Sequence, residues 1–177
     1  MDQDERIVDL CQSGRQEGFA RLLLAYQDRV YRRAYSFVHN REDALDITQE
    51  VFLRTIKGVK QFTPGRPLWP WLRRITTNLA LNFLRDRHTG LPLDNETMAA
   101  GLDPSDVAEA AWNAQQLHEA MGRLPPLYRM AMVLRHQEDL SYDEVARSME
   151  LPLGTVKTYL FRARQMLRME LTRRVEV

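Results

Sequence analysis

The chain has little of what a disulfide-stapled or membrane-spanning protein needs. It holds a single cysteine, Cys11, among 177 residues, so no disulfide can form within the chain and folding does not require an oxidising compartment. No stretch approaches the roughly 18 uncharged apolar residues of a spanning helix, so we expect no membrane insertion. The first residues are acidic and lack the basic and then apolar run of a secretory signal, so we expect a cytoplasmic protein.

Side chains that bind metals or carry out catalysis are also scarce. The four histidines lie far apart in the sequence, with no pair at helical spacing and no cysteine cluster. This spacing signals no metal site, and the chain has no glycine-rich phosphate loop and no nucleophile motif. We therefore expect no cofactor and no enzymatic activity. We interpret Cys11, near the start of the chain, as an incidental thiol.

Charge is balanced overall but uneven along the chain. Lys and Arg number 25, and Asp and Glu number 24. Residues 66–88 carry a net charge of +4 and residues 121–177 one of +3, whereas residues 89–120 hold six acids and no Lys or Arg. Two basic blocks separated by an acidic one suit a polyanion held at two places. They equally suit two solvated helical surfaces joined by an acidic loop.

Apolar residues recur every three or four positions almost throughout, and no strand-like alternation persists, which predicts an all-α fold. Asn40 is a candidate N-cap for a helix that ends near Gly58, with Ile56 among its buried residues. Pro70 is expected to open the next helix. The pattern there predicts that Trp71, Ile75 and Leu79 are buried.

Helical periodicity disappears over residues 89–104, where prolines and glycines accumulate. We interpret this stretch as a flexible acidic linker between two small helical domains, residues 1–88 and residues 105–177. Ser105 is a candidate cap for the first helix of the second domain.

The strongest local pattern lies near the C-terminus. Ser141 and Glu144 are spaced as a capping box, residues 150–154 read as a tight turn, and a second helix follows from about Thr155. Its apolar stripe consists of Val156, Leu160, Ala163, Leu167 and Leu171. A short capped helix, a turn and a basic second helix are typical of a helix-turn-helix.

The first turns of such a second helix are where base contacts fall in duplex DNA, and its arginines reach phosphates. The candidate contact residues are Thr155, Lys157, Thr158, Tyr159, Phe161, Arg162 and Arg164. The alternative is an amphipathic helix hairpin whose basic face is merely solvated.

A second candidate surface lies in the first domain. Asp46, Gln49 and Glu50 lie close together on one helix surface, and Phe52 and Leu53 extend the patch. Catalytic carboxylate pairs need a pocket that separates their pKa values, and an exposed helix face supplies none. Docking onto another protein explains the patch better, with a plain solvated face as the alternative.

Aromatic rings and arginines alternate over residues 62–87. This mixture suits unpaired bases, which stack on rings while arginine follows the backbone. The candidate contact residues are Phe62, Arg66, Trp69, Arg73, Arg74, Asn78 and Arg85. Packing in a core is the alternative, and we expect it for Trp71 rather than for Phe62 or Asn78.

Five segments, in this order, resemble an extracytoplasmic-function (group 4) sigma factor of the sigma-70 family. They read DALDITQEVFL from Asp43, WLRRITTNLA from Trp71, LPPLYR from Leu124 and LSYDEVA from Leu140. The fifth segment is GTVKT from Gly154, followed by FRAR from Phe161. The similarity runs from about residue 15 to residue 170 and omits only the linker. The resemblance implies two helical domains, with a helix-turn-helix in the second.

The same resemblance implies a role for each surface. Asp46, Gln49 and Glu50 would dock on the clamp helices of the largest subunit of core RNA polymerase, with the flap as a further polymerase contact. The first domain would melt the −10 promoter element, with Phe62, Ile75 and Asn78 at the positions of a pocket for a flipped base. The helix from Thr155 would read the −35 element as duplex. An anti-sigma factor would control the protein.

Departures from the family pattern fall at Leu45, where an acid is usual, at Trp69 and Pro70 in the loop, and at Tyr159, where arginine is common. The sequence thus predicts a sigma factor that directs core polymerase to promoters. The alternative is a stand-alone helix-turn-helix regulator that binds duplex DNA, which would leave the Asp46 patch and the aromatic–arginine block unused.

Overall fold

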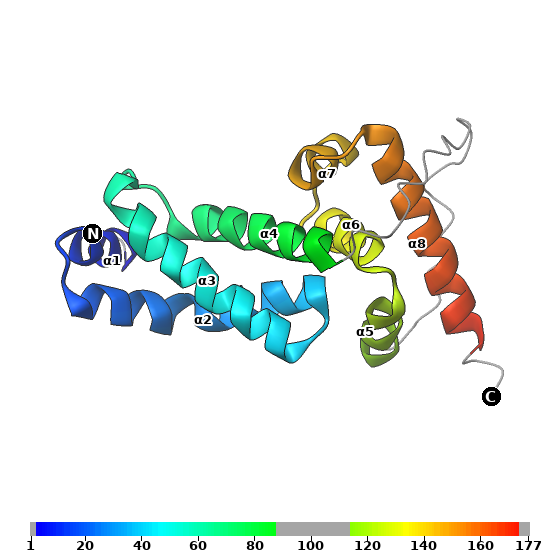
Figure 1. The fold of residues 1–177 in the computed structure, drawn as a ribbon, viewed down its shortest axis with the longest axis horizontal. Helices are drawn as coiled ribbons and strands as arrows, with labels where there is room; N and C mark the ends of the chain where they lie inside the picture. The colour runs from blue at the N-terminus through cyan, green and yellow to red at the C-terminus, as the bar shows by residue number, and fades with distance from the viewer. Residues whose placement is uncertain (1–2, 88–113, 174–177) are drawn as a thin grey trace. The chain divides into compact units, whose positions relative to one another are not determined.

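The computed structural model describes residues 3–87 and 114–173, and these residues form helices joined by short turns (Figure 1). The prediction of an all-α fold is confirmed for these residues. The chain divides into two compact units after Arg87. The predicted linker, residues 89–104, and the predicted cap at Ser105 lie outside the described residues.

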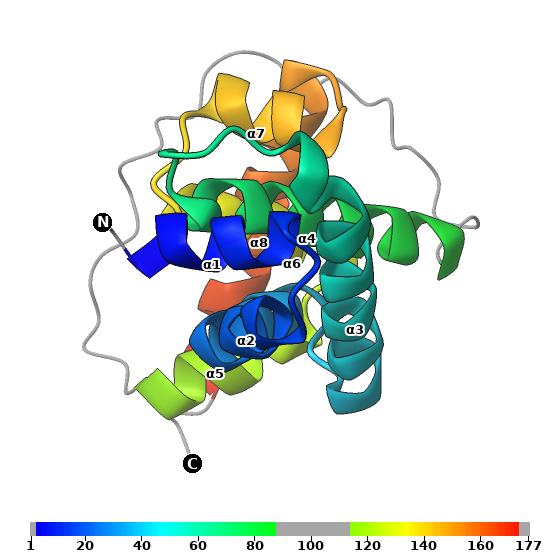
Figure 2. The ribbon, with the colours of Figure 1, turned by 90° about the vertical axis from the view of Figure 1, so that its left-hand side faces the viewer.

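The first unit is built around one long helix, α2 (Gln16–Val38), which packs against three others. These are α1 (Gln3–Gln12), α3 (Arg41–Gly58) and α4 (Leu68–Arg87), and a short 3₁₀ turn, η1 (Val59–Gln61), follows α3. Figure 2 shows α2 end-on with α3 crossing beside it. The fully buried core side chains include Leu22, Val30, Ala34 and Phe37 of α2, Ala44 and Val51 of α3, and Leu72 and Ala80 of α4.

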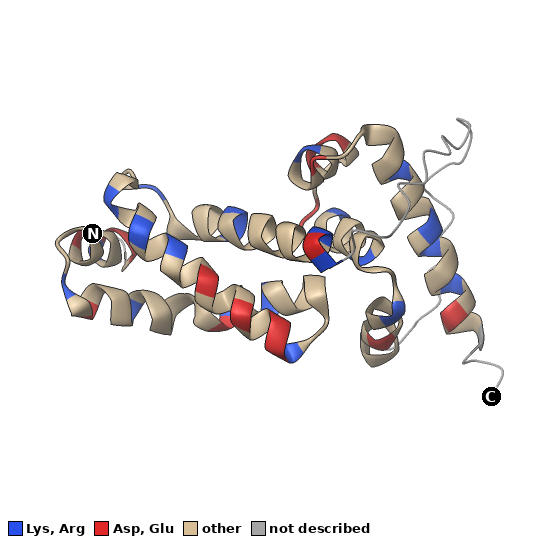
Figure 3. Ribbon diagram, viewed as in Figure 1, with Lys and Arg blue, Asp and Glu red and all other residues tan. Residues whose placement is uncertain are grey.

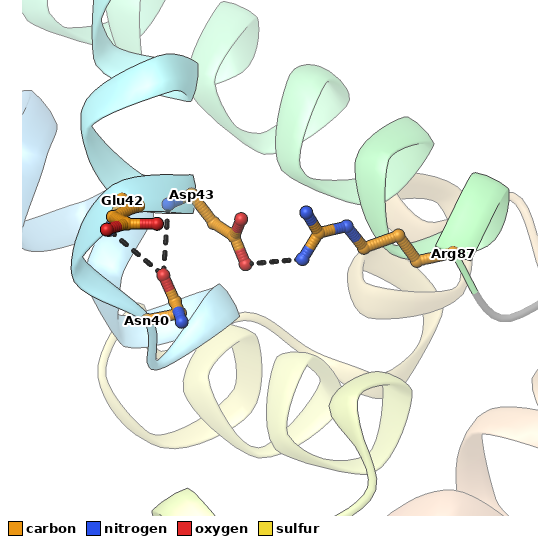
Figure 4. A network of polar contacts seen from close by, with 4 residues as sticks. All are labelled: Asn40, Glu42, Asp43 and Arg87. Carbon is orange, nitrogen blue, oxygen red and sulfur yellow. Dashed lines mark hydrogen bonds and ion pairs between the residues drawn. The ribbon is translucent and has the colours of Figure 1, made fainter.

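The start of α3 confirms the predicted cap. The Asn40 side chain accepts hydrogen bonds from the backbone N–H groups of Glu42 and Asp43, at 2.9 and 3.1 Å. The Asp43 carboxylate then receives Arg87 Nη1 at 2.8 Å (Figure 4). This ion pair joins the first turn of α3 to the last residue of α4, so the two helices run antiparallel and the end of the unit is fixed.

Three expectations about this unit are wrong in detail. Helix α4 begins at Leu68 instead of Pro70, because a side chain from α1 caps it, as described below. Ile56 is 39% exposed. Trp71 and Ile75 are half-buried, because the face of α4 that enters the core is the one that carries Leu72 and Thr76.

The second unit consists of α5 (Ala114–Arg123), α6 (Pro126–His136), α7 (Tyr142–Met149) and α8 (Leu153–Arg173). The predicted apolar stripe of α8 is confirmed, since all five of its side chains are buried. Buried Arg129 donates hydrogen bonds to the carbonyl oxygens of Met121, Gly122 and Leu124, which satisfies the end of α5. An ion pair between Arg123 and Glu170 also joins α5 to α8.

Three of the described non-glycine residues lie in the left-handed region: His39, Asp139 and Glu150. His39 closes α2 with φ of 53°, and Glu150 closes α7 with φ of 51°. The Glu150 N–H donates to the carbonyl oxygens of Ala146 and Arg147, which ends α7 sharply and sends the chain into α8.

The contact between α1 and α2 is unusually close, because Gly18 of α2 faces the backbone of α1. A Cβ atom at Gly18 would lie 2.6 Å from Cys11 N and 2.6 Å from the carbonyl carbon of Leu10. Cys11 itself is 1% exposed, and burial raises the pKa of its thiol to about 11. The thiol is therefore a protonated core group in this close helix contact.

We predict that Gly18→Ala destabilises the first unit, because the added methyl meets backbone atoms that cannot rotate away. Overpacking of this kind costs about 1–3 kcal/mol. Thermal unfolding monitored by circular dichroism checks this, with Ala20→Gly on the exposed side of α2 as the control for helix propensity alone. An unchanged midpoint for Gly18→Ala would contradict the close contact.

Candidate protein and nucleic-acid interfaces

The outer face of α3 carries an apolar line beside its acidic residues. Leu45, Leu53 and Ile56 are 42%, 51% and 39% exposed, and exposed Gln49 lies between them at helical spacing. Asp46 is exposed next to this line, and acidic residues colour the first half of α3 red in Figure 3. The surface is therefore a narrow apolar stripe bordered by acid.

Two residues of the predicted docking patch lie differently from the expectation. Phe52 does not extend the exposed patch, because its side chain points into the core and is 4% exposed. Half-buried Glu50 forms an ion pair with Arg54 at 2.8 Å, one turn further along α3. The residues that sequence reasoning missed are Leu45 and Ile56. The helical spacing Leu45–Gln49–Leu53–Ile56 was the available signal.

The loop between η1 and α4 is held at both ends by α1, which lies beside it in Figures 1 and 2. At its start, Gln12 Nε2 donates to the carbonyl oxygens of Val59 and Phe62, at 2.9 and 2.8 Å. At its end, one carboxylate oxygen of Asp4 accepts the Leu68 N–H at 2.8 Å. The other Asp4 oxygen accepts the Tyr26 hydroxyl. Asp4 thus serves as the N-cap of α4 from another helix.

Phe62 and Trp71 form one aromatic surface at the start of α4. Their ring centroids lie 4.8 Å apart, and the Trp71 ring covers Gly58, where a Cβ would approach it to 3.1 Å. Both rings are half-buried, so each packs and each stays partly accessible. Half-buried Ile75 and exposed Asn78 follow Trp71 at helical spacing on α4. The structure therefore brings these predicted contact residues together on one face.

Trp69 packs against other residues than Phe62 and Trp71 do. Its ring lies under the Arg29 guanidinium, whose central carbon is 3.8 Å from the ring centroid, and parallel to the Tyr26 ring. Both partners come from α2, so Trp69 faces α2 instead of the Phe62 ring. Of the predicted arginines, Arg66 and Arg74 are exposed, whereas Arg73 and Arg85 are half-buried.

The capping box that the sequence predicts opens the helix-turn-helix of α7 and α8. Ser141 accepts the Glu144 N–H at 3.3 Å, and the Glu144 carboxylate accepts the Ser141 N–H at 2.8 Å, which completes the capping box. Helix α8 begins at Leu153, two residues before the predicted Thr155, so Gly154 lies in its first turn. Basic residues recur along α8 in Figure 3.

The predicted contact residues of α8 fall into two groups. Lys157 is exposed, and Thr155, Phe161, Arg162 and Arg164 are half-buried. Thr158 and Tyr159 are each 6% exposed, so neither presents its side chain on the surface of this unit. Thr158 donates to the Gly154 carbonyl at 3.0 Å, and the Tyr159 ring packs 4.8 Å from that of Tyr128.

Tyrosines of neighbouring helices hold two arginines of α8. Arg162 Nη1 lies 3.4 Å from the Tyr128 hydroxyl of α6, and Arg164 Nη2 lies 3.0 Å from the Tyr142 hydroxyl of α7. Sequence reasoning missed both tyrosines, because each acts only through its position in the folded unit. The arrangement fixes long side chains that would otherwise lose entropy on binding.

Metal-ligating side chains are not gathered within residues 3–87 and 114–173: no group of three or more His, Cys, Asp or Glu is placed to hold an ion. None of the described helices combines the length and the apolar character needed to cross a membrane.

Comparison with known proteins identifies the family. The family model for sigma-70 region 2 matches residues 22–89, and that for sigma-70 region 4 matches residues 114–167. The ECF RNA polymerase sigma factor SigW of Bacillus subtilis strain 168 is 31% identical over 170 residues, which covers 89% of this chain and 91% of that protein. The chain belongs to the sigma-70 family, in its extracytoplasmic-function group.

Further relatives agree with this assignment. The RNA polymerase sigma-H factor of Pseudomonas aeruginosa is 31% identical to this sigma factor over 177 residues, covering 93% of the chain and 91% of that protein. SigE of Mycolicibacterium smegmatis is 39% identical over 152 residues, but the chain spans only 59% of its length. The region 2 match contains the α3 face and the α4 face, and the region 4 match contains the helix-turn-helix.

Solved structures share the fold of this sigma factor. The sigma factor RpoE of Bartonella quintana, solved with the anti-sigma factor NepR, gives a TM-score of 0.56 at 22% identity, over 87% of this chain and 96% of that one. CnrH, solved with the cytosolic domain of CnrY, gives 0.54 at 24% identity, over 97% and 98%.

We predict that Asp4→Ala loosens the start of α4. The change leaves the Leu68 N–H without its carboxylate acceptor, and the loss of an N-cap costs about 1–2 kcal/mol. Hydrogen exchange measured by NMR should show the Leu68 amide exchanging about tenfold faster or more. Asp9→Ala, at an exposed position of the same helix, is the matched control. Equal exchange in the two variants would show that Asp4 does not cap α4.

Proposed function

We propose that this sigma factor binds core RNA polymerase and directs it to promoters, reading the −35 element as duplex and the −10 element as melted single strand. The observation that carries the proposal is the presence of both regions in one chain, each with a distinct exposed surface. The first unit presents the α3 stripe and the Phe62–Asn78 face, and the second presents the basic face of α8.

The chemistry of each surface indicates which partner it binds. The α3 stripe, Leu45, Gln49, Leu53 and Ile56 with Asp46 beside it, suits the clamp helices of the largest subunit, because apolar side chains supply affinity and the acid supplies orientation. Phe62, Trp71 and Asn78 offer a ring edge and an amide to an unstacked base. Lys157 lies one turn into α8, where a major-groove helix reaches base edges.

This role involves no catalysis by the sigma factor itself, since the polymerase carries out the chemistry. Two small units on one chain bind promoter DNA tightly only when a third body fixes their spacing, so we propose that the free chain binds promoters weakly. We also propose that an anti-sigma factor controls it, as the complex of Bartonella quintana RpoE with NepR illustrates for that protein.

Run-off transcription tests the proposal directly. Purified bacterial core polymerase is supplied with a pool of genomic fragments, with and without the chain. New transcripts whose start sites share two spaced upstream elements would support the proposal and define the promoter. Absence of transcripts, together with failure of the chain to bind core polymerase in a pull-down, would refute it. Tight duplex binding by the chain alone would instead favour the stand-alone regulator.

We predict that Leu53→Asp weakens binding to core polymerase about tenfold or more. Burying a half-exposed leucine contributes about 1.5 kcal/mol, and a factor of ten corresponds to about 1.4 kcal/mol. Leu24→Asp is the matched control, because Leu24 is 78% exposed on α2, away from the stripe. Fluorescence anisotropy with labelled protein measures both affinities. Equal losses in the two variants would remove the α3 stripe from the interface.

We predict that Lys157→Ala lowers initiation through the upstream element. A base contact is worth about 1–3 kcal/mol, so the loss should be roughly ten- to a hundredfold. Transcription is compared on two templates, one with the native −35 element and one with that element replaced. The variant should fall on the native template only. A similar fall on both would mean that Lys157 acts without reading sequence.

A further inference from the structure

Helix α1 lies along the loop that joins η1 to α4, from one end of the loop to the other (Figures 1 and 2). Gln12, the last residue of α1, donates to the carbonyl oxygens of Val59 and Phe62, where the loop begins. Asp4, in the first turn of α1, accepts the Leu68 N–H, where the loop ends. Helix and loop therefore run in opposite directions, and α1 fixes both ends of the loop.

Phe62 is the loop residue that these hydrogen bonds place. Gln12 Nε2 lies 2.8 Å from the Phe62 carbonyl oxygen and 2.9 Å from that of Val59. The Phe62 N–H donates to the same Val59 oxygen at 3.1 Å. Both peptide groups that flank the Phe62 Cα are therefore hydrogen-bonded, and its backbone is held at φ of −73° and ψ of 135°. These two angles set the direction of the Cα–Cβ bond and limit the rotamers of the ring.

The ring of Phe62 is held from its other side by Trp71. The two ring centroids lie 4.8 Å apart at an interplanar angle of 31°. Trp71 in turn packs over Gly58 at the end of α3, where an added Cβ would approach the Trp71 ring to 3.1 Å. The Phe62 ring is thus in place before any ligand binds, and a side chain that is already ordered loses less conformational entropy on binding.

The position of Gln12 is itself fixed by the packing of α1 on α2. Cys11, the preceding residue, is 1% exposed, and a Cβ at Gly18 of α2 would lie 2.6 Å from the Cys11 backbone nitrogen. The glutamine therefore extends from a backbone segment that has no room to shift toward α2. The family comparison assigns it nothing, because the region 2 model matches residues 22–89 and α1 ends at residue 12.

We infer that Gln12 is a positioning residue for base recognition, which orders the Phe62 ring for a base of the melted promoter strand. This inference rests on the proposed function and extends it to α1, for which the sequence predicts no role in DNA recognition. Gln12 acts through Phe62 and need not contact DNA itself. Its loss should therefore weaken the hold on one base, while the contacts of the other nucleotides and of core polymerase are kept.

The test replaces Gln12 by methionine. Methionine has a similar length and helix propensity but no N–H donor and no charge, so Gln12→Met removes both hydrogen bonds without altering the electrostatic attraction to DNA. Gln16→Met, at the exposed first residue of α2, is the matched control. Thermal unfolding and affinity for core polymerase are measured for both variants, and both should bind core polymerase as the wild-type chain does.

The readout is the contribution of single bases to binding. Holoenzyme assembled from the full chain and core polymerase is titrated with fork-junction DNA that carries the non-template −10 strand of a promoter mapped by the run-off experiment. Each base of that strand is replaced in turn by an abasic site, and the loss of affinity is recorded for the wild-type chain and for Phe62→Ala. The position whose loss disappears in Phe62→Ala identifies the base held by the ring.

At that position, the abasic site should weaken binding to wild-type holoenzyme about tenfold or more, which is the scale of a base stacked on an aromatic ring. The same abasic site should weaken binding to the Gln12→Met holoenzyme about threefold or less, because each lost hydrogen bond is worth roughly two- to tenfold. The losses at the other positions should match those of the wild type. Gln16→Met should reproduce the wild-type profile at every position.

Gln12→Asn keeps the amide on a side chain that is one methylene shorter, and it provides a second variant if Gln12→Met fails to fold. Its loss at the Phe62-dependent position should lie between those of the wild type and Gln12→Met. A loss at that position that is unchanged in a folded variant, or that falls equally at all positions, would overturn the inference.

The run-off experiment separates this inference from the proposed function. If the wild-type chain yields no promoter-specific transcripts, the proposed function fails, and the inference fails with it. If transcripts form but no abasic position depends on Phe62, the assignment of the base face is wrong, and the inference is overturned as well. If such a position exists and Gln12→Met leaves it unaltered, the positioning role of Gln12 alone is wrong.

Discussion

The first unit depends on one helix that packs against three other helices at once. Helix α2 packs against α1, α3 and α4, and its buried side chains, from Leu22 to Phe37, are the common surface on which the others rest. A unit of this size has one small core, so no helix can leave its place without exposing a large share of it. The close approach at Gly18 sets the distance of α1, and α1 in turn sets both ends of the loop before α4.

This dependence explains how a scaffold of short helices can present two different faces. The α3 stripe and the Phe62–Asn78 face lie on helices that are fixed by α2 on their inner sides, so their outer sides are available for binding chemistry. In the second unit, side chains from neighbouring helices position the residues of the proposed binding face. Tyr128 and Tyr142, from helices that flank α8, hold Arg162 and Arg164 in place. Pre-ordered side chains lose less entropy when they bind.

Local signals in the sequence predicted much of this fold. The cap at Asn40, the capping box at Ser141 and the stripe of α8 each depend on residues within a few positions, and all are confirmed. The predicted start of α4 is wrong, because the cap of that helix, Asp4, lies 64 residues before Leu68 in the sequence. Phe52 and Tyr159 are predicted to lie on surfaces but are buried. Helical periodicity alone does not show which side of a helix a neighbouring helix covers. For Tyr159 that neighbour is Tyr128, on another helix.

The left-handed turn residues have a consequence for how this protein can change over evolutionary time. A side chain at positive φ is strained by about 1–2 kcal/mol, which glycine avoids, and His39 and Glu150 both accept this strain to end a helix. The protein is therefore less stable than it would be with glycine at position 39 or position 150. Mutations elsewhere that weaken the core can be offset by a single exchange to glycine at either corner. The surfaces on α3, α4 and α8 that we propose for binding can thus accumulate substitutions that fit new partners, while glycine at these turns restores the lost stability.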